Sequence, residues 1–287
     1  MVINMNYFFL FIIILMQLFE RIFAKQYNIK AKAPNINLFT AVGCFCALLF
    51  FLINSGGSIS FPRELIPYSA AFSMAFGTAS AAMIFAIKTG PLSITALITS
   101  YSLLIPTFYG ILFLHDPIHP TLYIGLAALL ISLYLINKNK DESMKFSPSW
   151  IIYILLTFIA NGMCSTIQKM QQVHFDGAYK NEFMIISLAV VTIVLLVLGL
   201  SKKGNKREML KPCIKYGAVK GLINGILNYL VMVVSASMPN SVLFPSISAG
   251  GIVLTFICAL TIYKEKLSKT QSVGYILGIV SVVFLNI

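Results

Sequence analysis

Long apolar runs separated by short polar connectors fill almost the whole chain. Each run is about 18 to 24 residues long, which is enough for an α-helix to cross a hydrocarbon core of about 30 Å. Apolar and polar residues do not alternate within the runs, so the pattern does not indicate a closed β-barrel. We therefore predict an all-α integral membrane protein with ten transmembrane helices. The predicted spans are residues 7–24, 36–53, 66–88, 91–114, 120–137, 149–168, 183–200, 213–235, 239–262 and 269–286.

Two segments of the chain resemble each other. Residues 68–112 and 216–260 align without a gap at an offset of 148 and share nine identities in 45 positions. Each segment also carries hydroxyl residues at steps of seven, nearly two helical turns, so that each trio lies on one helix face. The trios are Ser93, Ser100 and Thr107 in the first segment, and Ser241, Ser248 and Thr255 in the second.

This similarity predicts a duplicated chain of two five-helix repeats. We assign residues 1–140 to the first repeat, 141–148 to a connector and 149–287 to the second repeat. Because each repeat has an odd number of spans, the two would enter the membrane in opposite directions as inverted repeats. Substrate sites in such proteins lie near the midplane of the membrane, where the repeats meet.

The composition excludes a soluble domain, since 58% of the residues are hydrophobic and 10% are charged. The net charge of +12 lies in the connectors, where basic residues set topology beside anionic lipid, so no nucleic-acid partner is expected. The five cysteines lie in or beside apolar spans without ligand-like spacing, and we expect neither a disulfide, a metal nor a cofactor.

Basic residues are distributed unevenly between the two sides of the membrane. Seventeen of the 21 lysines and arginines fall in or beside the connectors that follow odd-numbered spans. The bias predicts that these connectors, including the basic loop 201–212, face the cytoplasm and that both termini face outward. We expect a multi-pass protein of a bacterial plasma membrane.

Two charged residues lie inside apolar spans, where charge is expensive and usually functional. Glu20 ends the first span and Lys220 begins the eighth, each one to two turns in and on the same side of the membrane. We expect them to pair with each other, or to handle a zwitterionic substrate or a proton together. The alternative is that both side chains extend to the membrane surface.

Polar side chains elsewhere in the spans complete a candidate binding site. Asn224 and Asn228 follow Lys220 at steps of four, so the three share one helix face. Ser100 and Ser248 lie near the middle of their spans and are candidates for a cavity wall, although such hydroxyls also serve in packing between helices. The candidate substrate-binding residues are Gln17, Glu20, Ser100, Asn161, Lys220, Asn224, Asn228 and Ser248.

Several connectors carry recognisable local signals. His115, Asp116 and His119 invite a metal interpretation, but two prolines and the lack of a fourth ligand favour a plain turn. Ser147-Pro148 predicts a helix start, and Ser268 to Gln271 fits a capping box before the last span. We expect the segment 169–182 to be a polar loop, and Pro106 and Pro245 to kink their spans.

The ends of both halves resemble the drug/metabolite transporter superfamily, EamA branch. In the second half, the resemblance rests on Pro239, Tyr263-Lys264-Glu265-Lys266-Leu267, Gln271, Gly274 and Gly278. In the first half, it rests more loosely on Pro91, Leu114-His115-Asp116, Gly125 and Ser132. The resemblance implies two inverted five-helix repeats around a central cavity lined by the first, third and fourth spans of each half. It also implies transport of small organic metabolites, commonly outward.

We therefore expect a secondary-active transporter, an exporter of small polar or amphiphilic metabolites such as amino acids, working by alternating access. The alternatives are a flippase for lipids or their headgroups and an intramembrane enzyme. An enzyme would need a His, Asp, Glu or metal constellation inside the spans, and the three histidines are all in connectors. The expected partners are a small-molecule substrate and the lipid bilayer, and a monomer suffices to enclose a cavity.

Overall fold

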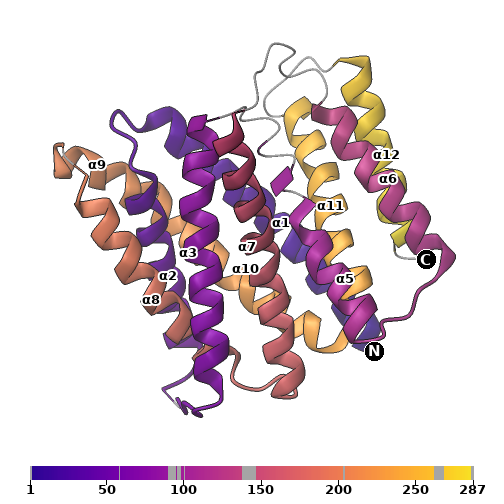
Figure 1. Ribbon diagram of the computed structural model, residues 1–287, viewed down its shortest axis with the longest axis horizontal. Helices are drawn as coiled ribbons and strands as arrows, with labels where there is room; N and C mark the ends of the chain where they lie inside the picture. The colour runs from indigo at the N-terminus through magenta and orange to yellow at the C-terminus, as the bar shows by residue number, and fades with distance from the viewer. Residues whose placement is uncertain are drawn as a thin grey trace. The chain divides into compact units, whose positions relative to one another are not determined.

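The computed structural model describes residues 2–57, 59–89, 95, 98–99, 101–137, 147–202, 204–261 and 268–285. All regular elements within these ranges are helical, and they are shown in Figure 1. In the first half they are α1 (Val2–Lys30), α2 (Ile36–Asn54), α3 (Leu65–Thr89), η1 (Tyr101–Leu103), α5 (Leu104–Phe113) and α6 (Pro120–Asn137). In the second half they are α7 (Pro148–His174), α8 (Lys180–Leu200), α9 (Lys206–Pro212), η2 (Cys213–Gly217), α10 (Ala218–Ser237), α11 (Asn240–Thr261) and α12 (Lys269–Leu285).

The predicted class, an all-α membrane protein, is confirmed, and each predicted span coincides at least in part with helix. Within the described ranges, six helices are long and apolar enough to cross a membrane, and four further apolar helices are shorter. The six are Met5–Lys30, Ile36–Asn54, Leu65–Ala86, Pro148–His174, Lys180–Leu200 and Lys206–Ser237. The count of ten crossings stays a prediction.

Two predicted loops are partly wrong, because helix continues into them. α7 extends to His174, and α9 begins at Lys206 and runs through the π-turn of η2 into α10. The side chain of Asn205 caps α9 by accepting a hydrogen bond from Arg207 N at 3.1 Å, and Met209 is buried. Local capping and burial of one side chain per turn therefore stabilise helix in a sequence whose charge suggested a loop.

The chain divides into two compact units that do not coincide with the two predicted repeats. Unit 1 comprises Met1–Gly77 and Ile167–Ala236, and unit 2 comprises Thr78–Thr166 and Ser237–Ile287. Each unit thus combines helices from both halves of the sequence. The repeat boundaries at 140 and 149 stay a prediction, and residues 138–146 lie outside the described ranges.

In unit 1, close approach between helices depends on glycine and serine. α2 packs along α8, as Figure 1 shows, and the side chain of Ser73 on α3 donates to the Ser187 carbonyl of α8 at 3.1 Å. α2 also meets α10, where a Cβ atom added at Gly221 would lie 2.1 Å from the carbonyl oxygen of Gly43. Small residues allow this approach of two backbones in a membrane helix pair.

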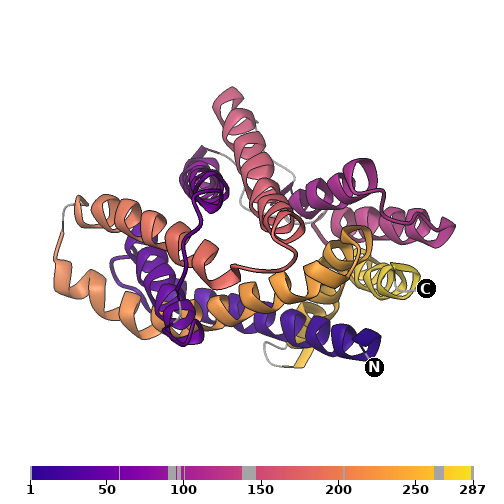
Figure 2. The same ribbon diagram turned by 90° about the horizontal axis from the view of Figure 1, so that it is seen from below.

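In unit 2, α6 and α12 run side by side in both views (Figures 1 and 2), and α11 packs against α5 and α12. The Ser281 hydroxyl of α12 donates to the Gly125 carbonyl of α6 at 2.8 Å. The predicted capping box of α12 is confirmed: Ser268 N donates to Gln271 Oε1 at 3.0 Å, and Gln271 N donates to Ser268 Oγ at 3.2 Å.

The principal helix pair in each unit joins equivalent positions of the two predicted repeats. α2 and α8 are the second spans of their halves, and α6 and α12 are the last spans. Pairing of equivalent helices is what a two-fold relation between duplicated halves would produce. The opposite orientation of the halves remains a prediction.

Replacing Gly221 by alanine should destabilise the protein, because the new methyl group meets the backbone of Gly43 rather than a flexible side chain. We expect a loss of about 2 kcal/mol in the free energy of unfolding, the usual size for overpacking. Gly77→Ala is the matched control, since no heavy atom of the described residues outside its own helical turn lies within 4 Å of a Cβ at that position, and it should stabilise by about 0.5 kcal/mol. Thermal unfolding of the two variants in the same lipid checks this, and equal midpoints would contradict it.

Candidate functional site

The polar face of α10 organises the candidate site in unit 1. Lys220, Asn224 and Asn228 stand at steps of four along a helix whose other residues are mainly apolar. Side chains at this spacing share one face. α1 and the end of α7 bring further polar side chains to that face.

Glu20 on α1 and Lys220 on α10 form an ion pair, as the sequence analysis predicted. Glu20 Oε1 lies 3.4 Å from Lys220 Nζ, and the side chains of Glu20 and Lys220 are 15% and 29% exposed. Pairing lowers the energy of two charges that would each be costly alone in an apolar environment.

Both residues lie farther from their helix ends than the sequence suggested. α1 continues to Lys30, nearly three turns beyond Glu20, and the continuous helix of α9, η2 and α10 begins almost four turns before Lys220. These lengths follow from the helical extensions into the predicted connectors. They favour pairing over extension of both side chains to the membrane surface.

A chain of amide hydrogen bonds continues from Lys220 along α10. Asn228 Nδ2 donates to Asn224 Oδ1 at 3.1 Å and to the Asn224 carbonyl at 2.9 Å. Gln168 Nε2 on α7 donates to Asn228 Oδ1 at 2.8 Å. We call Glu20, Lys220, Asn224, Asn228 and Gln168 the polar row.

Gln168 is the member of the polar row that the candidate site residues from the sequence did not include. It lies beside Lys169, Gln171 and Gln172, which were interpreted as the start of a polar loop. All four side chains are at most 6% exposed. Continuation of the helical period from Asn161 to Gln168, seven residues on, is the signal that could have identified it.

Gln17 lies one turn before Glu20 on α1, and three-residue spacing makes the two side chains neighbours. Gln17 Oε1 is buried and accepts no hydrogen bond from any described residue. Glu20 Oε1 is buried as well, and apart from its ion pair it makes no hydrogen bond within the described ranges. α1 therefore carries one buried acceptor without a hydrogen bond from the described residues, Gln17 Oε1, and one that is held by its ion pair alone, Glu20 Oε1.

The other predicted site residues belong to unit 2 or lie outside the description. Asn161 Nδ2 donates to Ser102 Oγ at 2.6 Å, which joins α7 to η1. Ser100 lies outside the described residues. Thr107, from the same hydroxyl trio, donates to the Leu103 carbonyl one turn earlier in the chain at 2.8 Å. Its hydroxyl is thus satisfied by the local backbone.

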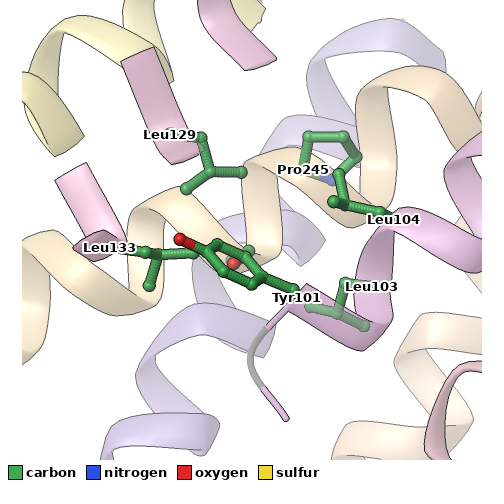
Figure 3. Close-up of a pocket in the computed structure, with 7 residues that line it drawn as sticks. Tyr101, Leu103, Leu104, Leu129, Leu133 and Pro245 are labelled. Atoms are coloured by element: carbon green, nitrogen blue, oxygen red, sulfur yellow. The ribbon is translucent and has the colours of Figure 1, made fainter. Parts of the chain in front are cut away.

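Ser248 lines a small hollow inside unit 2. The hollow has a volume of about 10 Å³, room for at most one water molecule, and Figure 3 shows Tyr101 at its centre with Leu129, Leu133 and Pro245 around the ring. The Tyr101 hydroxyl donates to the Leu130 carbonyl at 3.0 Å. This hollow is mainly apolar and is too small for a metabolite.

Asp116 has a structural contact in the turn where a metal was considered. Its Oδ2 atom accepts a hydrogen bond from Ser241 N at 3.0 Å, so the carboxylate caps the positive end of α11. A Cβ atom added at Gly110 would lie 2.3 Å from Asp116 Oδ2, so glycine leaves room for the carboxylate. In the described part of the chain, no group of three His, Cys, Asp or Glu side chains could hold a metal ion.

A comparison with known protein families indicates the class of protein. Residues 148–287 match the model of the EamA-like transporter family, which belongs to the drug/metabolite transporter superfamily. The resemblance noted in the sequence is thereby confirmed. None of the curated proteins matches the sequence.

Solved structures share the fold. Among the 29 matching chains, one described as "Crystal structure of protein" has a TM-score of 0.77 to this chain. The match covers 98% of this chain and 96% of the other, at 13% sequence identity. At that identity the likeness concerns the fold alone.

Proposed function

We propose that this protein is a secondary-active exporter of small polar or amphiphilic organic metabolites, such as amino acids, and that the polar row forms part of its binding region. The observation that carries the proposal is the Glu20–Lys220 ion pair, followed by the amide chain, within helices apolar enough to cross a membrane. The match of residues 148–287 to the model of a transporter family supports it.

The chemistry of the polar row suits reversible binding rather than catalysis. Lys220 supplies a positive charge, Glu20 a negative charge, and the amides of Asn224, Asn228 and Gln168 both donors and acceptors. A polar solute loses its hydration when it enters a membrane protein, and such groups replace the lost hydrogen bonds. Amide groups and charged side chains bind a solute without forming covalent bonds. The bound solute can therefore also be released on the opposite side of the membrane.

Alternating access would expose the polar row first to one side of the membrane and then to the other. Inverted repeats achieve this by exchanging the conformations of two halves of similar fold. We propose that the two predicted repeats do so, and that Gln17 contributes to the binding region beside the polar row.

Transport by purified protein in liposomes tests the proposal. A panel of radiolabelled amino acids and related metabolites should show uptake and efflux that depend on the protein, whereas Glu20→Lys and Lys220→Glu alone should each abolish it. The double variant Glu20→Lys/Lys220→Glu restores opposite charges and should recover part of the transport, at least tenfold above either single variant.

The same liposomes separate the competing functions. A Lys211→Glu variant, which reverses an exposed charge on α9, serves as the control and should transport normally. A double variant as inactive as the singles would exclude direct pairing in transport. Movement of labelled phospholipid without metabolite exchange would instead identify a flippase.

We further propose that the protein resides in the plasma membrane of a bacterium with residues 201–205 in the cytoplasm. A single cysteine at Ser201 in a variant lacking the native cysteines should react with a membrane-impermeant maleimide only after the cells are opened. The basic residues of α9 and η2 would retain this side in contact with anionic lipid. Full reactivity from outside intact cells would reverse the orientation.

A further inference from the structure

The directions of the hydrogen bonds in the polar row determine which groups α10 can offer to a ligand. Gln168 donates to Asn228, and Asn228 donates to Asn224, so the oxygen of each asparagine is engaged. Asn224 Nδ2 makes no hydrogen bond with any described residue, and Asn224 is only half-buried. Lys220 lies one turn earlier on the same face of α10, and its side chain is 29% exposed. At these two positions α10 itself therefore presents donors alone.

Lys220 holds its present partner loosely. The distance from Lys220 Nζ to Glu20 Oε1 is 3.4 Å, longer than the usual 2.7 to 2.9 Å of a charge-assisted hydrogen bond. Yet an ammonium group in an apolar environment needs an anion beside it. Only another negatively charged group can replace Glu20 without leaving Lys220 unpaired.

We propose that Lys220 and Asn224 form an oxyanion subsite for a carboxylate or phosphate group of the substrate, which takes the place beside Lys220 that the Glu20 carboxylate holds in this structure. This inference rests on the proposed function and names the chemical class of the substrate. Glu20 acts as an internal substitute for the substrate: it neutralises Lys220 while the subsite is free of ligand and leaves when the ligand arrives.

Gln17, the neighbour of Glu20 on α1, can accept a hydrogen bond from the displaced Glu20 side chain. A free carboxylate would be costly there, so Glu20 takes up one proton from water as it leaves Lys220. Its new O–H group can donate to Gln17 Oε1, the buried acceptor one turn away that has no hydrogen bond from any described residue. The exchange balances: one substrate anion enters, one proton binds Glu20, and Lys220 stays protonated.

Few other ionisable groups stand on the neighbouring elements. η2, which packs against both α1 and α2, carries Cys213, Lys215 and Tyr216, and α2 carries Cys44 and Cys46. On α1 itself, Arg21 follows Glu20 directly and has interactions of its own. Among these side chains, Glu20 is the carboxylate that changes its partner in the proposed exchange, and we therefore assign the proton to it.

Binding of small probes to the full-length protein in nanodiscs of zwitterionic lipid tests the subsite. Propionate and methyl phosphate should each raise the unfolding temperature in a saturable manner. Propionamide, a neutral analogue of similar size, and propylammonium should have no effect. Binding of propylammonium but neither anion would overturn the proposal.

The sign of one substitution distinguishes this subsite from a simpler polar site. Glu20→Gln removes the internal competitor and should tighten propionate binding about tenfold, which corresponds to about 1.4 kcal/mol. If Glu20 instead bound the ligand directly, the same substitution would weaken binding or leave it unchanged, and either result would overturn the proposal. Lys220→Met should abolish binding, and Lys211→Met, an exposed lysine on α9, should not change it.

A double variant and a change of lipid composition complete the binding experiment. Because Lys220→Met leaves Glu20 without its partner, the double variant Glu20→Gln/Lys220→Met serves as a well-folded protein that should still fail to bind propionate. Nanodiscs containing phosphatidylglycerol should weaken propionate binding in proportion to the anionic lipid if a lipid headgroup is the natural occupant, and should leave it unchanged if the occupant is a free metabolite.

The outcome is distinguishable from failure of the proposed function. Liposomes that transport only neutral or cationic metabolites, with no anion binding, would retain the carrier and reject the oxyanion subsite. Anion binding with the expected response to Glu20→Gln, but without transport of any solute, would retain the subsite and reject the carrier.

Discussion

The ion pair between Glu20 and Lys220 is the constraint from which the rest of the site follows. A lone charge in an apolar helix destabilises a membrane protein or is drawn to the surface, whereas a pair of opposite charges can remain at depth. Here the pair joins α1 to α10 with its charged atoms 3.4 Å apart. It sets the position of the amide chain, because Asn224 and Asn228 continue the same face of α10.

α10 can meet this constraint because its helical faces have different chemistry. Gly217 of η2 and Gly221 and Gly225 of α10 stand at steps of four and approach α2, where added Cβ atoms would lie between 2.1 and 3.4 Å from its nearest atoms. Lys220 and Asn224 each precede one of these glycines, and the rotation of about 100° per residue turns them onto a neighbouring face. Close packing against α2 thus fixes the rotation of α10, and that rotation presents the charged and amide side chains.

The sequence was sufficient for the features that depend on local chemistry. Hydrophobic run length predicted the helical membrane class, the spacing of Ser268 and Gln271 predicted the capping box, and charge inside apolar spans predicted the pairing of Glu20 with Lys220. Each of these follows from residues within a few turns or from a general cost of charge in lipid.

Features that depend on tertiary burial could not be predicted. Residues 169–174 and 206–212 are helical although their composition resembles a connector, because contacts with distant elements bury side chains such as Gln171 and Met209. Gln168 joined the site only through its bond to Asn228, sixty positions away. Asn161 and Ser248 were grouped with these residues on composition, yet they belong to a different compact unit.

The most direct measurement of the central claim is the ionisation state of Glu20 in a lipid bilayer. Difference infrared spectroscopy with isotope-labelled glutamate, comparing the protein with its Glu20→Gln variant, identifies the carbonyl or carboxylate band of this side chain. A charged pair predicts a carboxylate band in the protein at neutral pH and its conversion to a carboxylic acid band when Lys220 is replaced by methionine. A protonated Glu20 in the unaltered protein, or a band indifferent to the loss of Lys220, would contradict the account.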